Sequence, residues 1–276
     1  RIPNLSEAFT IVKVAIIATD LDGTFLRDDH QFDHHRFQAQ LDQMNAQGQH
    51  FVVASGNQLQ HCIDVFDGIN GELTYVAENG GLVIDNHGIV LAESVIEPAL
   101  YQELLVYVAT EPALAGAEIS VSGKQGAYIR PQDDSPIMRY YLSRLQVVPS
   151  LSAIDDHIYK ATFSWQATDA DAHAALINQQ FAGRLRATVS GGNGLDVIPP
   201  HVNKATGLAY LQQHWHVVPS QTAAFGDNGN DLEMLREADY SFAMQNAIAP
   251  VKEMATYLTS HDNNHDGVLA TIDTLI

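Results

Sequence analysis

The sequence has little cysteine and no long apolar segment. Cys62 is the single cysteine in a chain of 276 residues, which excludes an intrachain disulfide framework and a zinc site built from several cysteines. No stretch approaches the roughly 20 continuous apolar residues that a membrane-spanning helix needs. The first residues, Arg1-Ile2-Pro3-Asn4, show no basic region followed by an apolar one, so no signal peptide is expected. These features predict a cytoplasmic protein without a membrane partner.

Basic residues are also scarce. The chain has 33 acidic residues against 14 lysines and arginines, for a formal charge of −19. Nucleic acids and anionic membranes favour basic surfaces, so neither is an expected partner. An anionic substrate would be repelled at long range. Any phosphate chemistry in this chain therefore requires a local metal cation or a well-placed lysine.

The order of expected strands and helices indicates two kinds of architecture. Strands and helices alternate in the first third of the chain and again after Pro199-Pro200, as in a doubly wound parallel α/β sheet. Between these parts, paired strands with intervening helices indicate an α+β unit whose sheet is mostly antiparallel. We expect an α/β core over residues 1–83 and 197–276, interrupted by an inserted domain over residues 84–196.

The expected elements follow from apolar periodicity and turn residues. The core strands are predicted at residues 12–19, 51–54, 75–77, 222–225 and 241–244, and the core helices at 33–47, 58–66, 204–215, 231–238, 249–258 and 267–275. The inserted domain is predicted to have a hairpin at 82–91, helices at 98–110, 135–145 and 169–181, and strands at 118–121, 127–129, 159–165 and 185–189.

The most informative segment is Asp20-Leu21-Asp22-Gly23-Thr24, which directly follows the apolar run of residues 12–19. That run is typical of a parallel strand buried on both faces, and ligands bind beyond the carboxyl ends of such strands. Two carboxylates at this position are costly unless a cation or a proton-transfer role justifies them. An ordinary Asp-Gly turn is the alternative interpretation.

Three other segments place phosphate-binding or metal-binding groups at strand ends or helix starts. Ser55-Gly56-Asn57 follows a strand and offers a hydroxyl and a glycine N–H to a phosphate. Lys204 opens a helix, where its ammonium can neutralise phosphate charge. The segment Gly226-Asp227-Asn228-Gly229-Asn230-Asp231 follows another strand and supplies hard oxygen ligands suited to Mg²⁺. Each segment alone is typical of a loop, but their joint order indicates a phosphoryl-transfer site.

These four segments resemble the four motifs of phosphatases of the haloacid dehalogenase superfamily. The insertion resembles the α/β cap of the Cof-type, class IIB subgroup, and the resemblance covers essentially the whole chain. The segments 52–58, 76–80 and 262–267 are particularly similar to bacterial sugar-phosphate phosphatases of that subgroup. Asn57 stands where most Cof-type members have Arg, as in the sugar-phosphatase branch, and Gln245 replaces a usual Gly.

The resemblance implies a role for each matching residue. Asp20 would attack phosphorus and form an aspartyl phosphate, and Asp22 would act as general acid and then as general base. Mg²⁺ would bind the Asp20 carboxylate, the Asp22 backbone carbonyl and Asp227, and would also involve Asp231. The remaining residues would bind phosphate or substrate, or support the site: Leu21, Thr24, Ser55, Gly56, Asn57, Asn79, Lys204 and Asn230.

Several residues have simpler structural interpretations. His261 and His265 share the spacing of a zinc helix, but the residues between them favour a loop that caps the last helix. Tyr140, Tyr141 and Trp165 are expected in the core of the inserted domain. His30 is expected in solvent and Cys62 in a core. Glu78 and Asn79 suit either a substrate contact or a turn into the inserted domain.

We expect a Mg²⁺-dependent phosphomonoesterase that acts on sugar phosphates or similar small metabolites, as a monomer or weak homo-oligomer, with a mobile cap that selects the substrate. A phosphomutase of the phosphomannomutase type is the enzymatic alternative. A receiver-like phospho-acceptor module is disfavoured, because a receiver is about half this length and does not need Asp22. A nucleoside-triphosphate hydrolase is disfavoured because the sequence has no Gly-x-x-x-x-Gly-Lys loop.

Overall fold

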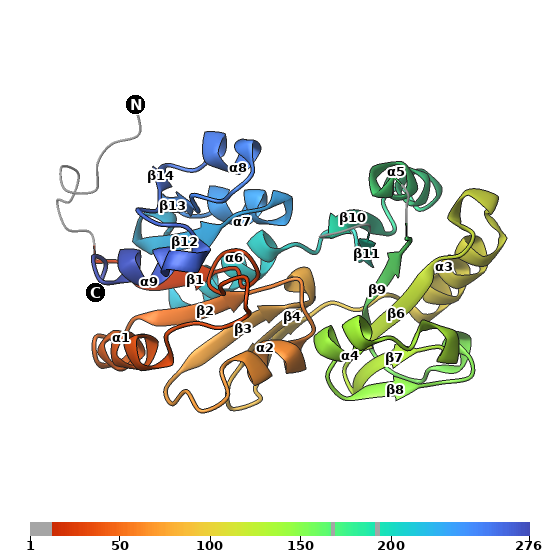
Figure 1. The fold of residues 1–276 in the computed structure, drawn as a ribbon, viewed down its shortest axis with the longest axis horizontal. Coiled ribbons are helices and arrows are strands. Elements are labelled where there is room, and N and C mark those ends of the chain that lie inside the picture. The colour runs from red at the N-terminus through yellow and green to blue at the C-terminus, as the bar shows by residue number, and fades with distance from the viewer. Residues whose placement is uncertain (1–12, 167–168, 191–193) are drawn as a thin grey trace. The chain divides into compact units, whose positions relative to one another are not determined.

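The computed structural model describes residues 13–166, 169–190 and 194–276. The expectations for the start of the chain and for Val12 in the opening strand lie outside these residues. The chain divides into two compact units, each with its own sheet (Figure 1). The first unit contains the described residues through Ser55, together with Phe66–Ala92 and Asn203–Ile276. The second unit contains Gly56–Val65 and Glu93–Val202.

The first unit is built on an eight-stranded sheet with the order β14-β13-β12-β1-β2-β3-β4-β5. The strands from β14 to β3 are parallel, and β4 is antiparallel to β3. The strands are β1 (Ile16–Thr19), β2 (His50–Ala54), β3 (Leu73–Ala77), β4 (Leu82–Asp85), β5 (Val90–Glu93), β12 (Thr222–Gly226), β13 (Tyr240–Ala243) and β14 (Tyr257–Leu258). The predicted doubly wound α/β sheet is confirmed.

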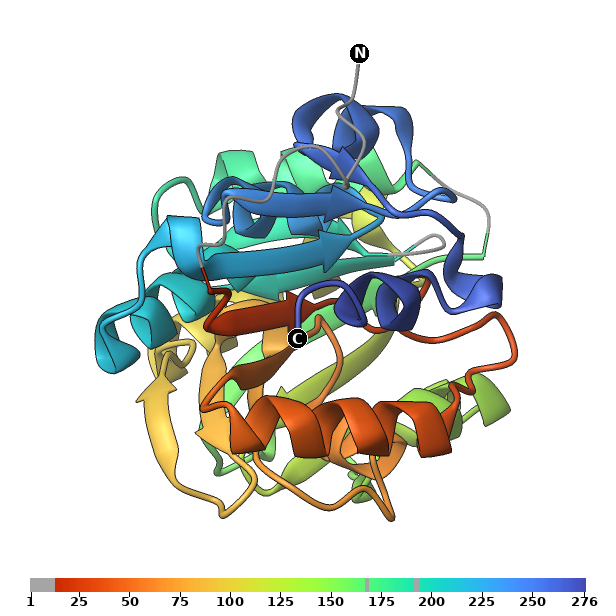
Figure 2. The ribbon, with the colours of Figure 1, turned by 90° about the vertical axis from the view of Figure 1, so that its left-hand side faces the viewer.

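Helices cover this sheet. Figure 2 shows α1 (His34–Ala46) and α9 (Gly267–Ile272) on the same face, where the Gln40 amide of α1 donates a 2.8 Å hydrogen bond to the Leu269 carbonyl of α9. The other helices of the unit are α6 (Lys204–Trp215), α7 (Leu232–Arg236) and α8 (Ala249–Met254). Short 3₁₀ turns lie at η2 (Glu78–Gly80), η6 (Pro219–Gln221), η7 (Gly229–Asp231) and η8 (Asn263–His265).

Strand β1 occupies a central place because its residues are all apolar or small and all buried. It pairs in register with β12 on one side and β2 on the other, so Thr19 lies opposite both Phe225 and Val53. All three strands run in the same direction, and their carboxyl ends therefore meet at one edge of the sheet. The segments that follow them begin with Asp20, Ser55 and Asp227, as the sequence predicted.

Local signals set the ends of the principal helices. Asp33 caps α1 by accepting a 3.0 Å hydrogen bond from the Arg36 N–H. Asn203 caps α6 by accepting from the Thr206 N–H at 2.8 Å, and the Thr206 hydroxyl in return accepts from the Asn203 N–H. This capping box fixes the start of α6, and with it the backbone of Lys204.

The second unit is built on a six-stranded sheet with the order β10-β11-β9-β6-β7-β8. Its neighbouring strands are antiparallel except for the parallel pair β7 and β8, which confirms the predicted α+β unit. The strands are β6 (Glu118–Gly123), β7 (Gly126–Ile129), β8 (Leu145–Val147), β9 (Ile158–Ser164), β10 (Arg186–Ser190) and β11 (Gly194–Ile198). The helices are α2 (Leu59–Val65), α3 (Pro98–Thr110), α4 (Pro136–Tyr141) and α5 (Ala170–Gln180), and 3₁₀ turns lie at η3 (Pro112–Leu114), η4 (Pro131–Asp133) and η5 (Leu151–Ala153).

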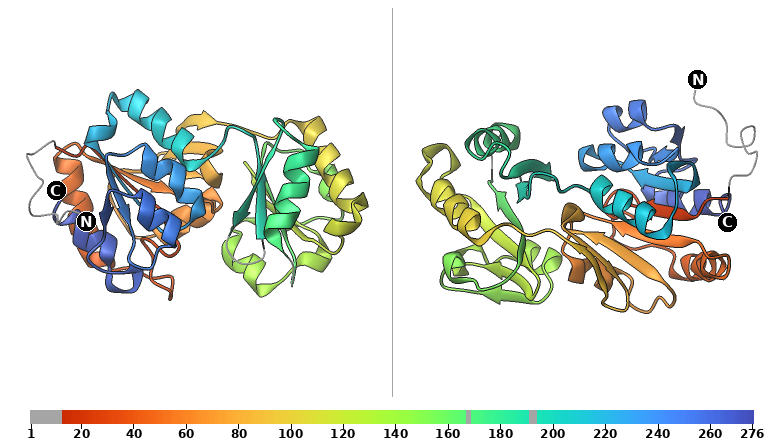
Figure 3. Two further views of the ribbon diagram at one scale, coloured as in Figure 1. Left: turned by 90° about the horizontal axis from the view of Figure 1, so that it is seen from above. Right: turned by 180° about the vertical axis from the view of Figure 1, so that it is seen from behind.

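Two of these helices form the core of the second unit with one face of its sheet. Figure 3 shows α3 and α5 on that face, and Leu104 of α3 and Ile177 of α5 are both fully buried there. They pack with the apolar residues of β6, β9 and β11, which alternate along each strand.

Two predicted helices are too long, and some strands were not predicted. The helix predicted over 135–145 ends at Tyr141, because Arg144 takes a φ of 50° and Leu145 begins β8. The helix predicted over 249–258 ends at Met254, because Ala255 is extended (ψ 148°) and β14 follows. Strand β11 was not predicted, since its short apolar stretch immediately precedes Pro199-Pro200.

The division of the chain also differs from the expected boundaries at residues 83/84 and 196/197. Both fall inside strands, β4 and β11 respectively. The hairpin predicted over 82–91 extends the first sheet, because Leu82 of β4 pairs with Ala77 of β3. Gly56–Val65 was assigned to the core but groups with the second unit, where the Ser143 N–H donates a 2.9 Å hydrogen bond to Gln58. The substrate-selecting role of residues 84–196 stays a prediction.

The close approach of α6 to β3 depends on Gly207. A Cβ atom at this position would lie 2.3 Å from Cγ1 of Val76. Alanine normally stabilises a helix interior relative to glycine by about 1 kcal/mol. We expect Gly207→Ala to lower the stability by roughly 1–3 kcal/mol instead, because the overlap must displace α6 or Val76. Thermal and urea unfolding measure the effect.

A double-mutant cycle separates overlap from other effects. Val76→Ala removes the obstructing methyl groups, so the double variant should be more stable than the sum of the two single changes. Gly229→Ala is the control, because nothing lies within 4 Å of the added Cβ. Additive effects of Gly207→Ala and Val76→Ala would contradict this account of the helix–strand packing.

Candidate active site

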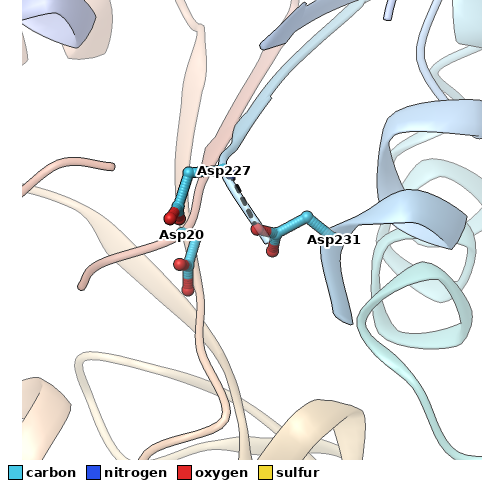
Figure 4. Close-up of side chains that lie close together, drawn as sticks. All are labelled: Asp20, Asp227 and Asp231. Carbon is cyan, nitrogen blue, oxygen red and sulfur yellow. Dashed lines mark hydrogen bonds between the residues drawn. The ribbon is translucent and has the colours of Figure 1, made fainter. Parts of the chain in front are cut away.

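Three carboxylates converge at the carboxyl edge of the first sheet. Asp20 follows β1, Asp227 follows β12, and Asp231 ends η7. One carboxylate oxygen from each lies within 4.8 Å of the others, and the close-up shows these side chains close together (Figure 4). The sequence predicted all three, and the parallel pairing of β1 with β12 brings them together.

A buried lysine bridges two of these acids. The Lys204 ammonium donates to Asp20 Oδ1 at 2.6 Å and to Asp231 Oδ1 at 2.7 Å. Lys204 is 1% exposed, and Asp231 is fully buried. An ammonium can lie at such depth only when it is paired with negative charge. The start of α6 thus places a positive charge between two carboxylates at the edge of the sheet.

Asp231 is held by more than the lysine. Its second oxygen, Oδ2, accepts hydrogen bonds of 3.0 Å from the backbone N–H groups of Asp227 and Asn228. Gly226 permits this arrangement, because a Cβ there would lie only 2.5 Å from Cβ of Asp231. Both oxygens of Asp231 therefore fix Lys204 and the Asp227 backbone, which is a positioning role.

Among the described residues, a hydrogen-bond donor is found for Oδ1 of Asp227 but not for Oδ2. Its Oδ1 accepts a 2.8 Å hydrogen bond from the Thr24 hydroxyl. Gly23 takes a φ of +74°, and a Cβ added there would lie 2.7 Å from Asp227 Oδ2. The glycine of the Asp20–Thr24 segment is therefore required both for the turn and for the space that this carboxylate occupies.

The electrostatics of the cluster are dominated by burial. Burial raises the pKa of Asp20 well above its ordinary value, and the neighbouring Asp231 and Asp227 add to the rise while Lys204 opposes it. Burial, together with the charge of Asp231, raises the pKa of Asp227 to about 6. Burial disfavours the charged form of Lys204, but Asp20 and Asp231 outweigh it and raise the pKa of the ammonium. The three carboxylates in their charged forms thus repel one another strongly.

The donor set fits a divalent cation. Three ionised carboxylates against one ammonium leave two negative charges, which a divalent ion would neutralise. All the available ligand atoms are hard carboxylate oxygens, as Mg²⁺ prefers. Asp20 and Asp227 are the side chains suited to hold it, whereas the oxygens of Asp231 already accept three hydrogen bonds.

Ser55 and Asn79 meet at the ends of neighbouring strands. The Ser55 N–H donates to the Val76 carbonyl at 2.9 Å, and the Ser55 carbonyl accepts from the Asn79 N–H at 3.0 Å. Asn79 is 3% exposed and takes a φ of 57°. Asn79 and Glu78 form the turn η2 between β3 and β4 of the first sheet, so the expected turn into the inserted domain is wrong, and a substrate contact stays a prediction.

The other predicted residues are placed as follows. Leu21 is fully buried, Asn230 lies within η7, and Gly56 and Asn57 group with the second unit. Gln245 stands where a glycine is usual, but its backbone does not take a positive φ, so this position does not require a glycine. Its amide instead donates to the Ser260 carbonyl at 2.7 Å.

Asp22 lies in the turn after β1 with a side chain that is 40% exposed. His30 Nδ1 lies 3.8 Å from Asp22 Oδ1, although the sequence indicated only a solvated histidine. The amide of Asn246 donates to the Gly23 carbonyl at 2.7 Å, and that of Asn263 donates to the Leu26 carbonyl at 3.0 Å. The two asparagine contacts join residues more than two hundred positions apart, so no local sequence signal could reveal them.

The histidine and aromatic interpretations have mixed outcomes. His265 lies in η8, where its N–H donates to the Asp262 side chain, as expected of a capping loop. Trp165 lies in the core of the second unit as predicted. The core position predicted for Tyr140 is wrong, because its side chain is 44% exposed and packs beside His61 of α2.

None of the helices in the described residues is long and apolar enough to cross a membrane.

Several known proteins are similar to this chain in sequence and in fold. The family profile of haloacid dehalogenase-like hydrolases matches residues 17–272. The 5-amino-6-(5-phospho-D-ribitylamino)uracil phosphatase of Escherichia coli K12 is 38% identical over 96% of this chain and 97% of its own length. An HMP-PP phosphatase of Yersinia pseudotuberculosis is 28% identical over 86% of both chains.

A crystal structure of a protein from Streptococcus mutans UA159 has a TM-score of 0.87 and 32% sequence identity, and the match covers 95% of this chain and 98% of that one. Both units of the fold are therefore shared with a solved structure. The chain belongs to the haloacid dehalogenase-like hydrolases of the Cof type and is a phosphatase.

Proposed function

We propose that this protein is a Mg²⁺-dependent phosphomonoester hydrolase that acts on sugar phosphates or similar small phosphorylated metabolites. The observation that carries the proposal is the buried Lys204 ammonium bound to Asp20 at 2.6 Å, beside Asp227 at the carboxyl edge of the sheet. The proposed nucleophile Asp20 thus lies next to Lys204, a cation for phosphate oxygens, and next to Asp227, a carboxylate suited to a metal ion. Phosphoryl transfer depends mainly on such positioning and charge neutralisation.

The reaction proceeds in two steps. Asp20 attacks phosphorus, and the bond from phosphorus to the leaving oxygen breaks while Asp22 gives that oxygen a proton. Water then attacks the phosphorus of the aspartyl phosphate and loses a proton to Asp22, which releases phosphate and restores Asp20. The half-exposed position of Asp22 suits exchange of protons with both a leaving group and water.

The other residues orient the phosphoryl group. Lys204 neutralises its oxygens, and Asp231 holds the ammonium in place through its 2.7 Å hydrogen bond. Ser55 and the Gly56 N–H are assigned to the same oxygens. Mg²⁺, held by Asp20, the Asp22 carbonyl and Asp227, would supply further neutralisation of the charge that develops in transfer.

The relatives support a small metabolite as substrate. The Escherichia coli relative is named for a ribitylaminouracil phosphate and the Yersinia relative for HMP-PP. Both names denote small organic phosphates, and the strongly acidic surface of this chain suits no large polyanion. We assign selection among such substrates to the second unit, since every motif assigned to the chemistry except Gly56 and Asn57 lies in the first.

The first test changes the two catalytic aspartates. Asp20→Asn should abolish turnover, because an amide cannot serve as the nucleophile, while its oxygen can still accept from Lys204 and preserve the fold. Asp22→Asn should lower kcat by roughly 10²–10⁴-fold through loss of proton transfer. Phosphate release and acid-quench trapping of a phosphoenzyme measure these effects, and circular dichroism checks the fold. Asp20→Asn with more than a few per cent of the wild-type rate would require direct attack by water.

Metal dependence is the second test. Turnover should vanish in EDTA and return with Mg²⁺, because the carboxylates and the phosphate together carry more negative charge than Lys204 can neutralise. Ca²⁺ should support turnover poorly, since its larger and looser coordination disturbs the in-line geometry. Full activity in chelator would contradict the proposal.

The third test uses stability rather than activity. The pKa of Asp227 is raised in the folded protein to about 6, so the metal-free protein should lose stability as pH rises from about 4 to 6. Asp227→Asn removes this penalty, and in EDTA at pH 7.5 it should stabilise the protein by roughly 1–2 kcal/mol. The gain should be smaller at pH 5.

Mg²⁺ should raise the melting temperature of the wild type but not that of Asp227→Asn. Asp67→Asn is the matched control, because it removes the same charge from an exposed turn and should leave the Mg²⁺ response intact. A Mg²⁺-induced shift retained in Asp227→Asn would show that Asp227 does not hold the ion.

A further inference from the structure

The loop after β13 has no part in the chemistry proposed above, but it contacts the turn that carries Asp22. Within this loop, the amide of Asn246 donates a 2.7 Å hydrogen bond to the Gly23 carbonyl. Gly23 directly follows Asp22, so this contact holds the main chain one residue beyond the proposed general acid. The loop therefore supports the backbone from which the Asp22 side chain extends.

The position of the Asp22 carboxylate depends on that backbone. The side chain is 40% exposed, so burial alone does not hold it in place. Gly23 takes a φ of 74°, and glycine has more backbone freedom than any other residue, so a hydrogen bond to its carbonyl restrains the turn. Proton transfer requires the acid to lie within hydrogen-bonding reach of the leaving oxygen, and small displacements are costly. The restraint on Gly23 therefore bears directly on the reaction.

The loop that carries Asn246 is anchored on both sides to the end of β12 and the residue that follows it. The Met244 N–H donates to the Gly226 carbonyl at 3.1 Å, and the Ile248 N–H donates to the Asp227 carbonyl at 3.0 Å. Asn246 lies between these two anchors. It therefore extends from a support that is fixed to the same segment as the Asp227 carboxylate.

Asn263 sets the orientation of the Asn246 amide. The Asn263 N–H donates to Asn246 Oδ1 at 3.2 Å, which directs the Nδ2 group of Asn246 to the Gly23 carbonyl. Asn263 is 2% exposed, and its own amide donates to the Leu26 carbonyl at 3.0 Å and to Asp28 Oδ1 at 2.9 Å. A buried asparagine thus fixes the exposed one that holds the turn.

We propose that Asn246 is a positioning residue for Asp22: its hydrogen bond to the Gly23 carbonyl keeps the Asp22 carboxylate where it can give a proton to the leaving oxygen. The inference rests on the proposed function, in which Asp22 is the general acid. Asn246 acts only through the turn and does not contact the phosphoryl group. Its contribution is therefore confined to substrates whose leaving group needs a proton.

The experiment compares two esters that differ by a single methylene group, 4-nitrobenzyl phosphate and 4-nitrophenyl phosphate. The benzyl alkoxide must be protonated as it leaves, whereas 4-nitrophenolate is stable without a proton. The value of kcat/KM includes only the steps up to departure of the leaving group, so the ratio of the two values measures general acid catalysis. All assays use saturating Mg²⁺.

Asn246→Ala is the principal variant, because Asn246 is exposed and the change should leave the protein folded. Gln245→Ala is the matched control, since it removes the neighbouring amide, which donates to the Ser260 carbonyl at 2.7 Å rather than to the turn of Asp22. Asp22→Asn is the reference for complete loss of the acid. The double variant with both Asp22→Asn and Asn246→Ala tests whether the two residues act together. Thermal unfolding checks the fold of each variant.

Asn246→Ala should lower kcat/KM about 10-fold for the benzyl ester and less than about 2-fold for the phenyl ester. Gln245→Ala should change neither value. In the Asp22→Asn background, Asn246→Ala should have almost no further effect, because no acid remains to be positioned. Equal loss for both esters would show that Asn246 supports the turn in general, and full additivity with Asp22→Asn would show that it acts elsewhere. Either result, or unchanged rates with both esters, overturns the inference.

Failure of the proposed function gives a different result. Equal loss for both esters in Asp22→Asn would show that Asp22 is not the general acid, whatever Asn246→Ala does. Absence of phosphate release from both esters in the wild type would contradict the hydrolysis of phosphomonoesters itself.

Discussion

The structure of the first unit depends on one buried ammonium. Lys204 lies between Asp20 and Asp231, at 2.6 Å and 2.7 Å, with almost no exposure to solvent. Without it, three carboxylates would be forced together at the sheet edge with no positive charge. Its position requires the capping box at Asn203 and the absence of a Cβ at Gly207, so features of α6 remote from the ammonium determine where that ammonium lies.

A related constraint governs the turn after β12. Asp231 uses both oxygens to hold Lys204 and the backbone of Asp227, and Gly226 leaves the room for it. The other two carboxylates of the cluster belong to Asp20 and Asp227, and burial raises the pKa of each. This accumulation of negative charge lowers the stability of the folded protein, and it gives the cluster a charge that a cation could neutralise.

The second unit distributes its apolar and charged side chains differently. Its sheet buries one face against α3 and α5 for stability, and it keeps hydrogen-bonding groups on the other. The net charge of Lys160 and Asp196 together is zero, in contrast to the first unit, where charge is concentrated. The two sheets thus differ in their electrostatics: charge of one sign accumulates at the edge of the first, and the charges on the second are paired.

The sequence by itself determined the parallel sheet, the principal helices and the identity of the charged cluster, because strand burial, caps and turn residues are local signals. The run before Asp20, the Asp33 cap of α1 and the helix start at Lys204 are examples. Only the tertiary structure decided that β4 and β5 extend the first sheet, that Tyr140 is exposed, and that Asp231 accepts a hydrogen bond from the Asp227 backbone. It alone paired Ser122 with Lys160 and Asn263 with Leu26, since strand register and loop contacts join residues far apart in the chain and leave no periodic trace in either segment.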